Sequence, residues 1–99
     1  MSKMEFENID DGVRAWRETP GAVLLDVRTP EEYASGHIPG SVNFPLERMR
    51  DYDGDVDAQI LAYCRSGSRS ARACALLEAM DYSATSIGGI VDYTGALER

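Results

Sequence analysis

Residues 59–80 read QILAYCRSGSRSARACALLEAM, and this stretch joins a short apolar run, a polar loop and a helical pattern. The run Gln59–Cys64 is bounded by polar residues, which is typical of a strand buried on both faces of a sheet. Apolar residues recur beyond the loop at the spacing of one helix face: Ala73, Leu76, Leu77 and Met80. A strand, a loop and a helix in this order predict an α/β unit.

The rest of the chain repeats this alternation of strands and helices. The run AVLLDV at residues 22–27 predicts a second central strand, and SVNF and ATSI, at residues 41–44 and 84–87, are further candidate strands. Ile9, Val13 and Trp16 share one face of a predicted helix, with Asn8 or Asp10 as its N-cap.

Three further segments complete the predicted helices. The segment TPEEYASG has Thr29 as N-cap, Pro30 at the first helical position and Gly36 as stop, which predicts a short helix. The segment LERMRDY, at residues 46–52, and the tail after Gly89 also have helical patterns. We therefore expect one α/β domain over residues 1–99, with a mainly parallel sheet whose ligand site lies at the carboxyl ends of the strands.

Composition excludes several classes of function. The formal net charge of −7 and the pI of about 4.5 argue against nucleic acid as a partner. No apolar run approaches the roughly 20 residues that span a bilayer, so no membrane association is expected. Acidic residues stand near the N-terminus where a leader peptide would be apolar, which predicts a cytoplasmic protein. Lys3 is the single lysine; adaptation to a saline cytoplasm and compositional drift explain this equally well.

Cysteine usage indicates thiol chemistry rather than a structural framework. Cys64 and Cys74 are too few for a disulfide scaffold and lack the spacing and histidine partners of a zinc site, so no metal is expected. Cys64 closes the buried strand, and the next helix is predicted to open around Ser70. Cys74 lies beside the apolar stripe of that helix and is interpreted as packing, with a resolving thiol as the lesser alternative.

The loop after Cys64 has the composition of an anion site. It consists of Arg65, Ser66, Gly67, Ser68 and Arg69 in an otherwise acidic chain. Small residues let successive N–H groups turn inward beside a helix N-terminus, where they stabilise an anion or a thiolate. The alternative is a small buried cysteine followed by a solvated turn.

Three segments together resemble the single-domain rhodaneses, a family of sulfurtransferases. They are LLDVRTPEEYASGHIPGSVNFP at residues 24–45, YCRSGSRS at residues 63–70 and IGGIVDY at residues 87–93. The resemblance implies a rhodanese-like three-layer domain with a mainly parallel five-stranded sheet flanked by helices. It also implies that Cys64 takes a sulfane sulfur from a donor such as thiosulfate and passes it, as a persulfide, to a thiol or cyanide, while Arg69 anchors the loop and helps to hold the anion. No cofactor is implied, and Tyr93 stands where the family usually has Trp.

Neighbouring residues have two interpretations each. Asp26 and Arg28 end the first strand, where they support the site through hydrogen bonds or form a structural ion pair. His37, in GHIPG, is interpreted as a turn residue that satisfies backbone groups, because a preformed thiolate needs no general base.

Other functions compatible with the same fold remain open. A sulfur relay to a partner protein would use the same chemistry at Cys64, and a regulatory interaction module would use the fold without it. A cysteine phosphatase is less favoured, because four residues separate Cys64 from Arg69 where the related phosphatases have five.

Overall fold

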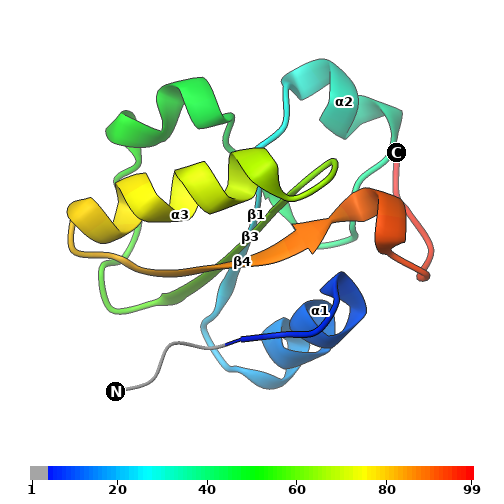
Figure 1. Cartoon of the computed structure of the whole chain (residues 1–99), viewed down its shortest axis with the longest axis horizontal. Coiled ribbons are helices and arrows are strands. Elements are labelled where there is room, and N and C mark those ends of the chain that lie inside the picture. The colour runs from blue at the N-terminus through cyan, green and yellow to red at the C-terminus, as the bar shows by residue number, and fades with distance from the viewer. Residues whose placement is uncertain (1–4) are drawn as a thin grey trace.

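The structure is a computed structural model that describes residues 5–99 (Figure 1). Its centre is a sheet with the strand order β2-β1-β3-β4, in which every neighbouring pair is parallel. The strands are β1 (Val23–Asp26), β2 (Val42–Asn43), β3 (Gln59–Cys64) and β4 (Ser83–Gly89). The carboxyl ends of all four strands therefore lie at one edge of the sheet.

Helices cover both faces of this sheet. They are α1 (Ile9–Glu18), α2 (Pro30–Ser35) and α3 (Ser68–Ala79), with the 3-10 helices η1 (Leu46–Asp51) and η2 (Ile90–Asp92). α3 and η1 lie over one face, and α1 lies over the other (Figure 1). The fold is the expected α/β arrangement of three layers around a parallel sheet.

The central strands are buried because each contributes side chains to both layers. Successive residues of β1 and β3 alternate between two apolar clusters. The cluster on the α3 side contains Leu25, Ile60, Ala62, Ala73 and Leu77. The cluster on the α1 side contains Ile9, Val13, Leu24, Leu61 and Ile87. Cys64 belongs to the first cluster, so its side chain points towards α3.

Local signals place the two N-terminal helices where the sequence predicts them. The Asn8 side chain accepts a hydrogen bond from the Asp11 N–H and caps α1. Thr29 and Glu32 form a reciprocal capping box at the start of α2, which ends at Gly36. Both ends of α2 are thus satisfied by residues close in sequence.

Some expectations differ from the structure. Residues 5–99 form a four-stranded sheet, whereas the family resemblance implied five strands; the residue patterns themselves predicted four. α3 begins at Ser68, two residues before the predicted start, because Gly67 lets the chain turn directly into the helix. The tail is helical only over η2, and beyond it Glu98 pairs with His37 in an isolated antiparallel bridge. Residues 46–51 are a 3-10 helix.

No helix within residues 5–99 has the length and hydropathy needed to cross a bilayer. Lys3 and the beginning of the acidic N-terminal stretch lie outside the described residues.

Candidate active site at the Cys64 loop

The loop between β3 and α3 reverses the chain within three residues. β3 ends at Cys64, α3 begins at Ser68, and the loop lies at the carboxyl edge of the sheet (Figure 1). Gly67 has a φ of 107°, a left-handed conformation that side chains disfavour, and it directly precedes the helix. This turn directs the first N–H groups of α3 towards the end of β3.

The Cys64 sulfur is surrounded by hydrogen-bond donors of the loop and of the first turn of α3. Its Sγ accepts hydrogen bonds from the Gly67 N–H at 3.0 Å and the Ser70 N–H at 3.4 Å. Burial raises the pKa of the thiol, but hydrogen bonds from the Ser70 backbone and side chain, and then from the Gly67 and Ser66 N–H groups, outweigh it and lower the pKa below its ordinary value. The thiolate is therefore favoured by dipoles that lie within hydrogen-bonding reach of the sulfur.

Two serine hydroxyls continue the hydrogen-bond network from the sulfur, and the sequence did not single out either serine as a site residue. Ser70 is fully buried; the neutral Cys64 thiol donates to its Oγ at 3.6 Å. The same Oγ lies 2.7 Å from the Ser86 Oγ of β4 and 3.1 Å from the Gly67 carbonyl oxygen. Ser86 is 16 positions away in the chain, so no local spacing could have indicated this contact.

The glycine pair at the end of β4 supports the loop from behind. A Cβ at Gly89 would collide with the carbonyl group of Arg65 and with the Cα of Ser66. The Val91 N–H donates a hydrogen bond to the Arg65 carbonyl at 3.2 Å. The second and third sequence segments that resemble the family therefore meet in space, because the loop backbone packs directly on a residue without a side chain.

Arg69 is held by a carboxylate from another helix. Its NH1 and NH2 groups donate to Glu32 Oε1 at 2.7 Å and Oε2 at 2.9 Å, a two-point contact between α3 and α2. Mainly through the hydrogen bond from Arg69, the pKa of Glu32 is lowered to about 2. The contact anchors the C-terminal end of the loop and neutralises the charge of Arg69. Glu32 is thus a third residue around the loop that the sequence did not single out, since it was indicated only as part of a helix start.

The remaining loop side chains face solvent. Arg65, Ser66 and Ser68 are exposed. Within residues 5–99, the Arg65 guanidinium forms no ion pair. It is thus a cation of the loop that is available to an anion arriving from solvent.

Asp26 and Arg28 lie at the same edge of the sheet but contact each other. The Arg28 NH2 donates to Asp26 Oδ2 at 2.6 Å and to the Gly36 carbonyl at 2.8 Å, and both side chains are buried. This pair ties the end of β1 to the turn after α2. The His37 Nδ1 lies 2.9 Å from the Tyr33 carbonyl in the same turn, as expected of a residue that satisfies backbone groups.

Two other expected features can be located in the structure. Cys74 is buried in the apolar cluster under α3. Tyr93 stands where the family usually has Trp, and its hydroxyl accepts a hydrogen bond from the Arg17 guanidinium at 3.3 Å. No group of three metal-ligating side chains gathers anywhere in residues 5–99.

Comparisons with known proteins match this chain to a rhodanese-like domain and to sulfurtransferases. A family model described as a rhodanese-like domain matches residues 10–96. A sulfurtransferase of Allochromatium vinosum is 41% identical over 69 residues, which are 66% of this chain and 63% of that protein. Thiosulfate sulfurtransferase GlpE of Pseudomonas entomophila is 33% identical over 81 residues, covering 80% of this chain and 74% of GlpE.

Two further matches differ in their context. The HTH-type transcriptional regulator Rv0324 of Mycobacterium tuberculosis is 47% identical over 53 residues, which are 50% of this chain but only 23% of the regulator. A solved rhodanese-like domain protein from Staphylococcus aureus superposes with a TM-score of 0.81 at 29% identity, covering 96% of this chain and 97% of that one. The chain thus spans less than two thirds of the length of the Allochromatium vinosum sulfurtransferase and of Rv0324, and nearly the whole length of the Staphylococcus aureus protein.

Proposed function

The chain belongs to the rhodanese-like domain family, and on this premise we propose that it is a sulfurtransferase that carries sulfur on Cys64. The observation that carries the proposal is the ring of donors around the Cys64 Sγ, with the N–H groups of Gly67 at 3.0 Å and Ser70 at 3.4 Å. A thiolate held in this way is both nucleophile and leaving group. Relatives named thiosulfate sulfurtransferase support thiosulfate as the donor.

The reaction proceeds by two displacements. The Cys64 thiolate attacks the outer sulfur of thiosulfate, a new S–S bond forms, and the old S–S bond breaks so that sulfite leaves with the electron pair. A thiophilic acceptor, cyanide or a thiolate, then attacks the outer sulfur of the persulfide and returns the electron pair to Cys64. This scheme predicts ping-pong kinetics.

The loop supplies the charge stabilisation that the first displacement needs. The donor is a dianion, and in this proposal the Arg65 guanidinium, which is exposed, and the loop N–H groups receive it. Arg69 contributes through position, because its guanidinium is bound to Glu32 at 2.7 and 2.9 Å. Asp26 and Arg28 support the edge of the sheet on which the loop stands.

The test is sulfur transfer from thiosulfate to cyanide by the purified protein and by Cys64→Ser. Intact mass spectrometry of the thiosulfate-treated protein should show an adduct of roughly +32 Da, one sulfur, on the wild type alone. Turnover by Cys64→Ser at the wild-type rate would refute the proposal. A persulfide that forms without turnover to cyanide would indicate a relay to a different acceptor.

A regulatory role is the second candidate, and one observation favours it. Rv0324, whose name describes a transcriptional regulator, contains a segment that is 47% identical to 53 residues of this chain. A domain that senses sulfur species through a persulfide would use the same thiolate. Such a role would appear as persulfide formation that is stoichiometric and slow to turn over.

A cysteine phosphatase is less well supported. Glu32 is the carboxylate that touches the loop through Arg69, and its pKa is about 2. A group that stays ionised at neutral pH is unsuited to protonate a leaving alkoxide. The loop is also one residue shorter than in the phosphatases, which leaves less room for a phosphoryl group.

A further inference from the structure

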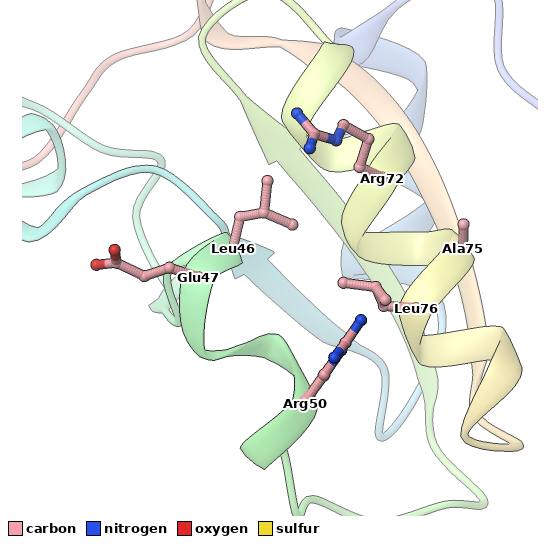
Figure 2. A pocket seen from close by; sticks show the side chains of 6 residues that line it. All are labelled: Leu46, Glu47, Arg50, Arg72, Ala75 and Leu76. Carbon is pink, nitrogen blue, oxygen red and sulfur yellow. The ribbon is translucent and has the colours of Figure 1, made fainter.

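A hollow of about 700 Å³ lies between η1 and α3, on the face of the sheet opposite α1 (Figures 1 and 2). It is lined by Leu46, Glu47 and Arg50 of η1 and by Arg72, Ala75 and Leu76 of α3. Gly67 and Ser70, which contact the Cys64 sulfur, are not among these residues, and neither is Glu32, which holds Arg69. The hollow is therefore a different place from the active-site loop, and its volume is within the range of small-molecule sites.

The floor of the hollow is apolar. Leu46 and Leu76 are half-buried and pack against the core cluster on the α3 side. Figure 2 shows both side chains directed into the gap between the two helices. η1 and α3 thus leave apolar side-chain surface accessible from solvent, and a ligand with an apolar stem would remove that surface from water.

Two arginines approach this floor from opposite walls. Figure 2 shows the Arg50 side chain extending from η1 and the Arg72 guanidinium projecting from α3, with Leu46 and Leu76 between them, while the Glu47 carboxylate points away. Both arginines are exposed, and neither forms an ion pair with any residue in 5–99. Guanidinium groups bind carboxylates through paired N–H donors. The arrangement is therefore complementary to two carboxylates that are joined by an apolar stem.

The charge of the whole chain favours a small ligand over a protein partner. The formal net charge is −7, so a second copy of the chain, or any acidic protein, would be repelled over its whole surface. A basic protein would instead meet the two guanidinium groups. A small anion meets mainly the local potential of these groups, because charges further away than about 8 Å are largely screened at physiological ionic strength.

We propose that this hollow, which we call the arginine groove, binds a small organic dicarboxylate with an apolar stem. Arg50 and Arg72 each bind one carboxylate, and the stem covers Leu46 and Leu76. The site is independent of the proposed sulfur transfer, because no residue of the Cys64 loop takes part in it. A bound ligand contacts both η1 and α3 and stabilises the folded chain by mass action.

Binding is tested with suberate, a linear dicarboxylate whose flexible chain adjusts to the spacing of the two guanidinium groups. It is titrated into 13C-methyl-labelled protein, and the Leu46 and Leu76 methyl signals are followed by NMR. The methyl signals of Leu24, which belongs to the cluster on the α1 side, are the internal reference. Suberate should shift the two groove leucines and leave Leu24 unchanged.

Two analogues of the same chain length separate charge from apolar contact. Octanoate lacks one carboxylate, and suberamide has neutral amides in place of both. Because a solvent-exposed ion pair contributes about threefold to an equilibrium constant, octanoate should bind about threefold and suberamide about tenfold more weakly than suberate.

Variants then assign the two carboxylates to the two arginines. Arg50→Gln and Arg72→Gln should each raise the dissociation constant of suberate about threefold, and the double variant should raise it about tenfold. Suberamide should bind equally to the wild type and the double variant. The matched control is Arg14→Gln/Arg99→Gln, which changes the net charge equally at two exposed arginines outside the groove and should leave suberate binding unchanged.

Cys64→Ser separates the groove from the active-site loop, and it should bind suberate like the wild type. An equal loss of affinity in Cys64→Ser and in the double variant would refute a separate site. Because binding is measured without a sulfur donor, failure of the groove leaves the proposed sulfurtransferase function standing, and a chain that forms no Cys64 persulfide still tests the groove.

Several results would overturn the arginine groove. They are unmoved Leu46 and Leu76 signals in the presence of suberate, equal affinity for suberate and suberamide, and an equal loss of affinity in the Arg14/Arg99 control. Shifts of the same signals on dilution of the protein alone would show that a second copy occupies the hollow. Shifts caused by an acidic peptide but not by suberate would show that a protein segment does, and either result would refute a small dicarboxylate as the ligand.

Discussion

Removal of one hydroxyl group should change the acidity of Cys64 measurably. In Ser70→Ala the backbone N–H of residue 70 still reaches the sulfur, so only the side-chain donor is lost. Hydrogen bonds to charged groups contribute about 1.5–3 kcal/mol, and the 3.6 Å distance between Sγ and Oγ places this one near the lower limit. Since one pKa unit corresponds to 1.36 kcal/mol, we expect the Cys64 pKa to rise by about one unit.

The assay is the rate of iodoacetamide alkylation at Cys64 as a function of pH. Peptide-resolved mass spectrometry separates Cys64 from Cys74, which is buried in the apolar cluster. Because the thiolate is the reacting form, the midpoint of the Ser70→Ala profile should lie about one pH unit above that of the wild type. At a pH below both midpoints the rate should be about tenfold lower.

Two further variants make this result specific. Ser68→Ala removes an exposed hydroxyl from the same loop and should leave the midpoint unchanged. Ser86→Ala removes the partner 2.7 Å from the Ser70 Oγ and should shift the midpoint by less than Ser70→Ala does. If Ser70→Ala keeps the wild-type midpoint while remaining folded, the hydroxyl does not stabilise the thiolate and the backbone N–H groups act alone.

Other predictions concern the frame around the loop. Gly89→Ala should lower kcat/KM for thiosulfate at least tenfold, because its methyl group would displace the Arg65 carbonyl; unchanged kinetics would contradict the close packing. Arg69→Lys keeps the charge but loses the two-point contact with Glu32, so KM for thiosulfate should rise several-fold, and a wild-type KM would show that the guanidinium geometry is unimportant. Glu32 has a pKa of about 2 against an ordinary 4.5, so its stabilisation is complete above about pH 4.5 and is lost as the pH falls towards 2. Its side chain is 30% exposed, so denaturant unfolding at pH 6 and pH 3 should show about 1–2 kcal/mol of acid-dependent stability that Glu32→Gln lacks; equal acid dependence would refute the assignment.

The fold could be read from the sequence because its signals are local. The apolar run of β3 was predicted with the bounds observed, and Thr29 and Gly36 delimit α2 as expected. Two-sided burial of a parallel strand gives a continuous apolar run, which needs no knowledge of the partner strands. The start of α3 was placed late because Gly67 acts as a left-handed N-cap, a role that its spacing alone does not reveal.

The site could be predicted only in part. The sequence singles out Cys64 and the loop as the candidate site, since a thiol between a strand and a helix N-terminus is visible in the chain order, and their catalytic role stays a prediction. The contacts that complete the site are formed by residues distant in sequence: Glu32 lies 37 positions before Arg69, and Ser86 lies 16 positions after Ser70. Their side chains are ordinary for a helix start and a strand, so their roles depend on tertiary packing.

The arginine-rich loop suggests that cations stabilise the Cys64 thiolate, but two of the nearby arginines are paired with carboxylates. Arg69 is neutralised by Glu32 and Arg28 by Asp26, so neither adds a net positive charge at the sulfur. The thiolate is instead stabilised by N–H and O–H dipoles at short range, which salt screens little because the sulfur is buried. The donor, in contrast, meets the exposed Arg65 in solvent. Increasing the salt concentration should therefore raise KM for thiosulfate while leaving the alkylation midpoint of Cys64 almost unchanged, and a midpoint that moves in parallel with KM would show that free cations, not dipoles, hold the thiolate.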